Sequence, residues 1–501
     1  SQYSSIMLDR WETVRTFLSK NKKKYTVYDI FPENYFITSK DHFTFFKKAA
    51  FNDEWNHELI NRIFKNFKSK KIIIEKKLIN IKNSEKKIRS GFELQSFFYK
   101  PLLIIDNLLS PIAFKYNYII FESFYYPLKE YVFMCLKNLL IPAKYLSFFN
   151  YESSNEKTDL VKKNRLKSDL FKIKEKNSFM KFLYENIHID LPLNYLENFE
   201  FLRQKSEKIS NKSKMIFSMH SWNYNDFFKI FLAHSILKNK SKLVISDHGG
   251  GLDKGLNLLN SVYHNRVSYK KISWKKNNSR LNLNLSPLHS IISKKLKKKE
   301  QKKKKFLTIL FSECSRYQNR IDTIPYFSDE VESFIEFMQG SRKLKPNLKK
   351  IVKFRIKDSY SINADKIFSE VFGKSTLVDF KKESFIKTLN KSKLILSNYP
   401  TTSYTEAMFL NLPIILFCKK SVRMYRNENL KIFNLLKKHN MAFDNYEKLI
   451  IFINNNWHKV DDWWNNDMVQ KTRSLYLKNF FNVKKTWAND WSNYIYSVNK
   501  Q

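Results

Sequence analysis

The chain is poor in the residues that break or cross-link a fold, with 7 glycines, 11 prolines and 3 cysteines among 501 residues. The cysteines Cys135, Cys314 and Cys418 are widely separated, which excludes a disulfide framework and the usual zinc spacings. No apolar run reaches the 18 or more residues that a membrane span needs, and the first residues do not resemble a signal peptide. These absences predict a protein of a reducing, cytoplasmic compartment.

Acidic residues are also scarce, since 47 Asp and Glu stand against 91 Lys and Arg, a formal net charge of +44. Such an excess favours a polyanionic partner: nucleic acid, an anionic membrane face or a phosphorylated substrate. The abundance of Lys, Asn, Ile, Phe and Tyr is also typical of an AT-rich genome, which accounts for most of the lysine without any ligand. Hydrophobic residues make up 43% of the chain, enough for large cores in two or more domains.

A lysine-rich stretch divides two series of alternating strands and helices. Nine of the twelve residues from 294 to 305 are lysine, which predicts a solvated linker or, as the alternative, a contact with an anionic membrane surface. The predicted order is an N-terminal domain over 1–300 (a mostly helical elaboration over 1–210 and a Rossmann-like core to about 293), the linker over 294–305, a nucleotide-sugar-binding domain over 306–460 and a helical tail over 461–501.

Both series have the spacing of parallel βαβ units. In the first, strands are predicted at 118–121, 215–220 and 243–246, with a helix at 226–237. In the second, strands are predicted at 306–311, 351–355, 376–379, 394–397 and 413–417, with helices near 328–338, 364–372, 383–390, 402–410 and 430–437. The expected fold class is therefore α/β of the GT-B type, in which two Rossmann-like domains face a cleft, with an N-terminal helical elaboration and a C-terminal helix.

Four of the seven glycines fall between residues 249 and 255, directly after a predicted strand of the first series. Glycine allows positive φ and close approach of the backbone to a ligand, and open α/β sheets bind ligands at the carboxyl ends of their strands. For the glycine cluster, a plain flexible turn is the alternative. A structural role is equally open for His220, which ends the predicted strand at 215–220. The candidate loop residues are Gly249, Gly250 and Gly251, and the candidate catalytic residues are Asp247, His248 and His220.

One predicted strand of the second series ends in a hydroxyl-rich turn, and a helix begins there. Thr401, Thr402 and Ser403 can cap this helix, whose free N–H groups and dipole suit a phosphate. Glu406, one turn further on, is placed to accept hydrogen bonds from a ribose diol, and Asn411 is expected in the left-handed C-cap conformation. An ordinary capped βαβ unit without a ligand is the alternative.

Further anion contacts are expected after the first strand of the second series, at Ser312, Glu313 and Arg316. Arg355 offers a planar fork for a carboxylate or phosphate, unless its strand is only a basic surface strand. No Asp-x-Asp metal motif lies in a suitable loop, and Asp461-Asp462 is typical of a helix start. We therefore expect no metal and no cofactor beyond a nucleotide-sugar substrate, and full activity after EDTA treatment.

Several segments resemble known transferases. Glu406-Ala407 and Pro413, seven positions after the glutamate, resemble the nucleotide-sugar motif of GT-B glycosyltransferases. Residues 191–197, the His-Gly-Gly-Gly run and residues 272–274 resemble landmarks of a bacterial family, the LIC12162-type transferases, in the expected order over about 180–420. The resemblance implies an enzyme of bacterial surface polysaccharide synthesis, lipopolysaccharide included, similar to transferases that use CMP-activated ulosonic acids such as Kdo or nonulosonic acids.

The expected function is thus a glycosyltransferase that moves a CMP-activated ulosonic acid to a glycan or lipid-linked glycan acceptor, in the cytoplasm or peripherally on the inner membrane. The leaving phosphate would meet the start of the helix at Thr402, with Arg316 and Arg355 beside it. Two alternatives remain: a basic nucleic-acid-binding protein, and a GT-B nucleotide-sugar epimerase or non-catalytic relative. The lysine run has no interleaved aromatic residues, which counts against nucleic acid.

Overall fold

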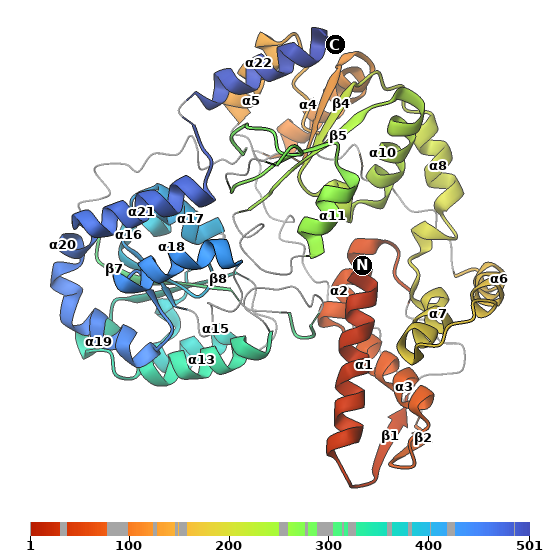
Figure 1. Ribbon diagram of the computed structural model, residues 1–501, viewed down its shortest axis with the longest axis horizontal. Helices are drawn as coiled ribbons and strands as arrows, with labels where there is room; N and C mark the ends of the chain where they lie inside the picture. Colours follow the sequence, from red (N-terminus) through yellow and green to blue (C-terminus); the bar gives the residue numbers. More distant parts are fainter. Residues whose placement is uncertain are drawn as a thin grey trace.

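The computed structural model describes residues 2–30, 38–77, 99–123, 128–145, 149, 158–249, 259–275, 279–287, 304–312, 315–318, 327–357, 363–378, 383–400, 402–417, 426–484 and 486–500. Figure 1 shows two α/β lobes and, below the first of them, an N-terminal unit in red and yellow. Within these ranges, no helix is long and apolar enough to cross a membrane.

The first lobe is built on a parallel sheet with the strand order β3-β4-β5-β6. Its register pairs Glu122 with Ser218 and Ser246 with Ile272, so the carboxyl ends of all four strands lie at one edge. Helices cover both faces, which is why the strands are continuous apolar runs rather than alternating ones. The strands are β3 (Ile119–Glu122), β4 (Met215–Ser218), β5 (Lys242–Ser246) and β6 (Lys270–Ile272).

The two faces of this sheet are covered by helices from distant parts of the chain. One face carries α4 (Tyr99–Tyr116), α8 (Phe199–Glu207), α9 (Ser221–Tyr224), α10 (Asp226–Asn239) and α11 (Leu259–Val267). The other carries α5 (Leu128–Lys137) and the last helix, α22 (Trp487–Lys500). Trp491 of α22 lies with its ring centroid 5.4 Å from that of Phe217 in β4. The last helix therefore packs on the first lobe, after the chain has formed the second (Figure 1).

The second lobe has a parallel sheet with the order β11-β10-β9-β7-β8. The chain runs from β7 outward to β8 and then returns to the other side of β7, so the winding reverses between β7 and β9. Ligands in open α/β sheets bind beyond the carboxyl ends of the strands at such a reversal. The strands are β7 (Phe306–Ser312), β8 (Val352–Lys357), β9 (Ser392–Ser397), β10 (Ile414–Phe417) and β11 (Ala442–Phe443).

Two apolar cores lie on the two faces of the second sheet, as a doubly wound sheet requires. One face packs against α13 (Phe327–Ser341), α14 (Pro346–Lys349), α15 (Ala364–Phe372) and α19 (Tyr446–Asn456). The opposite face packs against α16 (Phe385–Lys391), α17 (Thr402–Phe409), α18 (Asn427–Lys438) and α21 (Asp467–Phe480), with α20 (Val460–Asn465) leading into the last of these.

The N-terminal unit has an apolar core of its own, centred on Trp11, Trp55 and Phe182. Its α3 begins at a good cap, because Asn52 Oδ1 accepts from the Trp55 N–H at 2.6 Å. The unit contains α1 (Gln2–Lys20), β1 (Tyr25–Asp29), α2 (His42–Phe51), α3 (Asp53–Phe67), β2 (Ile72–Lys76), α6 (Leu160–Phe171) and α7 (Ser178–Asp190), with β1 and β2 pairing in parallel.

The expected α/β plan of two facing Rossmann-like domains is confirmed, and Asp461-Asp462 does begin a helix, α20. The strand predicted at 376–379 is wrong. Thr376 ends a 3-10 turn, Lys374–Thr376, and its hydroxyl donates back to the Gly373 carbonyl at 2.6 Å. Only an isolated bridge from Leu377 to Phe354 follows among the residues described there. Within the mostly helical elaboration predicted over 1–210, the strand predicted at 118–121 is β3 of the first lobe's sheet, and α4 packs on that sheet.

Candidate active site

The carboxyl edges of the two sheets meet at Gly249, the first glycine of the cluster. Gly249 follows β5 and is buried, and a Cβ added to it would clash with the Oγ1 atom of Thr402, the first residue of α17. The Thr402 hydroxyl would have to shift to admit any larger residue at position 249. The turn after β5 and the start of α17 are therefore in direct contact.

Packing beside this contact holds the lobes together. Trp274, two residues after β6, is 1% exposed and lies with its ring 4.9 Å from that of Phe481. Phe409, at the end of α17, also packs against Phe481, at 4.9 Å. Lys275 forms an ion pair with Glu428 of α18. Both edges thus reach the same region, and the contacts are apolar at Trp274 and charged next to it.

His220 and His248 lie together at the edge of the first sheet. His220 follows β4, His248 follows β5, and their ring centroids are 4.2 Å apart with the planes at 44°. His220 is half-buried and His248 is exposed. Imidazole is the side chain best suited to take up and release a proton near neutral pH. The structure thus brings two of the predicted catalytic residues side by side.

Asp247, the third predicted catalytic residue, is 2% exposed and its described contacts lie within the first lobe. Its Oδ2 accepts from the Trp274 backbone N–H at 3.3 Å, and its carbonyl accepts from the Trp274 indole N–H at 3.1 Å. Its Oδ1 lies 3.8 Å from Nδ1 of His264, which is itself buried. These contacts join the turns after β5 and β6, so Asp247 positions the loop that carries His248 and Gly249.

Glu122, which ends β3, is a buried acid that the sequence interpretation missed. Its carboxylate accepts hydrogen bonds from Ser218 at 2.7 Å, from Ser123 at 2.8 Å and from Ser221. Burial raises the pKa of the Glu122 carboxyl, against the lowering effect of the three serine hydroxyls. The Ser123 hydroxyl in turn accepts a hydrogen bond from the backbone N–H of His220 at 3.1 Å. Glu122 thus organises the turn on which His220 sits.

The switch point of the second sheet is closed by an amide. Asn398, which follows β9, accepts from the Ser312 N–H and donates to the Ser312 carbonyl, both at 3.0 Å. This pair ties the ends of β7 and β9 together beside the start of α17. Thr402 and Ser403 are half-buried in the first turn of that helix, and Glu406 is 7% exposed. Hydroxyls and N–H groups therefore dominate this edge, as a phosphate site needs.

Asn411 has the left-handed conformation predicted for it, with φ of 56°. Its side-chain oxygen accepts from the Trp464 indole N–H at 2.9 Å. The end of α17 is thereby anchored to the following helices, while the start of α17 faces the other lobe.

The two arginines expected at the donor phosphate have other partners. Arg316 forms an ion pair with Asp53 of α3 at 3.0 Å. The Arg355 guanidinium donates to the Glu383 carbonyl and to the Thr388 hydroxyl, each at 2.9 Å, and burial lowers its pKa. Arg355 is only 9% exposed, so it is not a residue of a basic surface strand. Neither arginine is shown at the start of α17.

Four predicted residues, Gly250, Gly251, Glu313 and Thr401, lie outside the described residues, as does most of the lysine-rich linker. Over the residues that the structure describes, no group of three or more His, Cys, Asp and Glu is arranged to hold a metal ion.

The segment 191–197 acts as a structural anchor. The Tyr195 hydroxyl donates to Asp226 Oδ1 at 2.6 Å and the Asn194 amide donates to Asp226 Oδ2 at 3.3 Å. Lys229 pairs with the same carboxylate at 3.0 Å, and the backbone N–H of His42 donates to it at 2.9 Å. This segment therefore joins the start of α10 to α2 of the N-terminal unit.

Two parallel sheets, each covered by helices on both faces and in contact through Gly249 and Thr402 at their carboxyl edges, define an α/β fold of the GT-B type. The chain belongs to the LIC12162 family of transferases, which matches residues 1–495. It is accordingly a transferase. No curated protein sequence matches it.

Two solved structures are similar to this chain. A variant of the wall teichoic acid polymerase TagF, soaked with CDPG, matches at 9% identity and a TM-score of 0.37, covering 81% of this chain and 98% of that chain. UGT71G1 of Medicago truncatula, complexed with UDP-glucose, matches at 11% identity and a TM-score of 0.23, covering 99% and 95%. The fold assignment rests on the topology of the chain itself.

Proposed function

We propose that this transferase is a glycosyltransferase that binds a nucleotide-sugar at the switch point of the second sheet and performs proton transfer at the edge of the first. The observation that carries the proposal is the contact of Gly249 with Thr402. It brings a pair of histidines and the N-terminus of an eight-residue helix to a common region. A donor phosphate at α17 would thus have its sugar directed toward His248.

In this proposal the imidazole of His248 removes the proton from an acceptor hydroxyl. The hydroxyl oxygen forms a bond to the anomeric carbon of the donor, and the bond from that carbon to the phosphate oxygen breaks. The nucleotide leaves as an anion, which the N–H groups at the start of α17 and the hydroxyls of Thr402 and Ser403 stabilise. His220 shares the proton with His248, and Glu406 accepts hydrogen bonds from the ribose.

The finer proposal is that the donor is a CMP-activated ulosonic acid and the acceptor a glycan or lipid-linked glycan of the bacterial surface. Its support is the family resemblance in the motifs around His248 and Trp274. The internal contacts of Arg316 and Arg355 weaken one part of it, because both were expected to hold the donor's carboxylate and phosphate. Attraction of the lysine-rich linker to an anionic membrane surface belongs to the same proposal.

Thermal-shift measurements with CMP, UDP, GDP and ADP test the donor site without knowledge of the acceptor. We expect one nucleotide, CMP in the finer proposal, to raise the melting temperature of the intact protein. Glu406→Gln abolishes this shift, whereas Glu370→Gln, at an exposed position of α15, leaves it unchanged. The same nucleotide should be released from its sugar donor, with and without EDTA.

Three outcomes contradict the proposal. A stabilising effect of DNA with none of any nucleotide would favour the nucleic-acid-binding alternative. A nucleotide shift unaffected by Glu406→Gln would move the donor site elsewhere. Activity lost with EDTA and restored by Mg²⁺ would end the metal-independent part of the proposal.

A further inference from the structure

A cavity of about 830 Å³ lies between the N-terminal unit and the helices of the first lobe. Its walls come from α1, α2 and α7 on one side and from α9, α10 and α11 on the other. Its volume is within the range of about 300–1,000 Å³ that small-molecule sites occupy. The N-terminal unit therefore forms half of a cavity large enough for a sugar or a short oligosaccharide.

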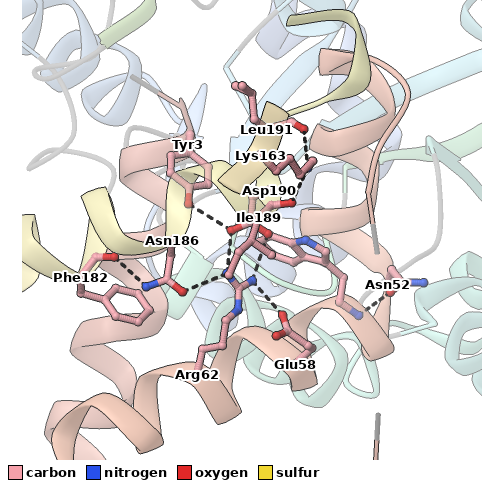
Figure 2. Close-up of polar contacts among 11 residues, drawn as sticks. Tyr3, Asn52, Glu58, Arg62, Lys163, Phe182, Asn186, Ile189, Asp190 and Leu191 are labelled. Atoms are coloured by element: carbon pink, nitrogen blue, oxygen red, sulfur yellow. Dashed lines mark hydrogen bonds and ion pairs between the residues drawn. The ribbon is translucent and has the colours of Figure 1, made fainter. Parts of the chain in front are cut away.

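One wall of this cavity is held by a buried polar network (Figure 2). Arg62 donates to both oxygens of Asp190, at 3.0 and 3.1 Å, and pairs with Glu58 at 2.8 Å. The Tyr3 hydroxyl donates to Asp190 Oδ2 at 3.0 Å. Asp190 and Tyr3 line the cavity, and Asp190 is 4% exposed. The Arg62 fork neutralises Asp190 and fixes this wall before any ligand arrives.

The opposite wall begins two residues after His220. Trp222 and Asn223 line the cavity and follow His220 by two and three residues. Tyr263 and Arg266 belong to α11, the helix that follows the glycine-rich segment. The rings of Trp222 and Tyr263 are 5.5 Å apart. The cavity therefore lies next to the turn that carries His220, although neither of the paired histidines lines it.

The lining offers aromatic surface and one cation that lacks a protein partner. Tyr263 is 47% exposed, and apolar and aromatic side chains make up most of the lining. Lys229 also lines the cavity, but it pairs with Asp226 at 3.0 Å. Arg266 is exposed and makes no hydrogen bond or ion pair with the described residues, and the Gln2 amide nitrogen is buried without an acceptor. A guanidinium in this state is suited to a carboxylate or phosphate.

We propose that this cavity holds the acceptor of the transfer reaction, that the acceptor is a sugar bearing a carboxylate or phosphate, and that Arg266 determines this specificity. The inference rests on the proposed function, because it assigns the acceptor to a site beside the catalytic histidines. Sugar rings pack against the aromatic wall, and the anionic group pairs with Arg266. The N-terminal unit thus selects the substrate.

The test uses the full chain and three probes that share one sugar: galactose, galacturonate and galactose 6-phosphate. Ligand-observed NMR titration measures the dissociation constant of each. We expect at least one anionic probe to bind about tenfold more tightly than galactose, the size of a charge-assisted hydrogen bond. The comparison of galacturonate with galactose 6-phosphate identifies which anion is preferred.

Arg266→Gln should remove the preference for the anionic probe and leave galactose binding unchanged, while Arg266→Lys retains part of it. Arg165→Gln is the matched control, since Arg165 is exposed on α6 and does not line the cavity. Equal binding of all three probes, no binding of any, or a preference that survives Arg266→Gln would overturn the inference.

Nucleotide thermal shifts on the same samples separate this inference from the proposed function. A nucleotide shift with no Arg266-dependent sugar preference contradicts the acceptor site alone. An Arg266-dependent preference without any nucleotide shift supports the sugar site and contradicts the proposed donor site.

Discussion

The carboxyl edges of the two sheets differ in the chemistry of their side chains. The first edge presents groups that gain and lose protons, namely Glu122, His220 and His248, and it holds them with serine hydroxyls and buried packing. The second edge presents hydroxyls, an amide and a helix start around Ser312, Asn398 and Thr402. In the proposed function this difference corresponds to a division of labour, in which the first lobe would perform the reaction and the second would bind the donor's phosphate.

The largest expected effect comes from removing the imidazoles of the first edge. His248→Ala and His220→Ala should each lower the transfer rate by about 100- to 10,000-fold, as loss of a general base does. Nucleotide binding should be unchanged, because the second edge is intact. Steady-state transfer assays check this, with exposed His458→Ala as control. Transfer rates equal to that of the unmodified protein in both variants would contradict the contrast between the two edges.

Removing the packing that links the two edges should have nearly as large an effect. Trp274→Ala removes a side chain that is 1% exposed and packs on Phe481, so we expect a loss of about 3–5 kcal/mol in the free energy of unfolding. Trp11→Ala, in the separate N-terminal core, is the matched control. Urea unfolding gives both losses. Nucleotide affinity measured on the two variants should fall only for Trp274→Ala. A fall in both variants would show that Trp274 has no particular role in linking the two edges.

The contact between the edges can be tested at Gly249. Gly249→Ala places a Cβ against the Thr402 hydroxyl, and we expect a loss of about 1–3 kcal/mol in the free energy of unfolding, as for other overpacked sites. In a Thr402→Ala background the same substitution should cost clearly less, because the clashing oxygen is gone. A double-mutant cycle by thermal unfolding measures this coupling. Additive effects would show that the two residues do not meet in solution.

The smallest expected effect is on the pH dependence of the free energy of unfolding, to which Glu122 of the first edge contributes. Burial raises the pKa of this carboxyl above its ordinary value of 4.5, so the folded protein binds its proton more tightly than the unfolded chain does. This contribution to stability is fully present below pH 4.5 and is lost as the pH rises through the raised pKa. Glu122→Gln should remove that slope in unfolding measurements from pH 4 to 8, whereas Glu370→Gln, at an exposed position, keeps it.

The architecture and the placement of one glycine follow from local patterns in the sequence. Buried strands such as 243–246 are short apolar runs bounded by polar residues, and Gly249 stands where a strand end must approach a second element. The conformation of Asn411 was predictable from its place at the end of a helix, because Asn tolerates the left-handed C-cap conformation. Glu122 was detectable too, as a polar residue at the end of an apolar strand.

Other parts of the site depend on contacts between distant segments. Arg316 pairs with Asp53, which lies in the N-terminal unit, so its sequence neighbours do not indicate its partner. The buried guanidinium of Arg355 donates to the Glu383 carbonyl and to the Thr388 hydroxyl, both well separated from it in sequence. The cavity at Arg266 is assembled from helices at both ends of the first 270 residues. The sequence pattern predicts the helix at 226–237, but it predicts neither α11 nor the assembly of these helices around a cavity.

Calorimetric titration of the preferred nucleotide into two variants tests the central claim most directly. The division of labour predicts that His248→Ala binds the nucleotide like the unmodified protein and transfers no sugar, whereas Glu406→Gln loses nucleotide binding. Loss of nucleotide binding in His248→Ala together with full binding in Glu406→Gln would contradict it.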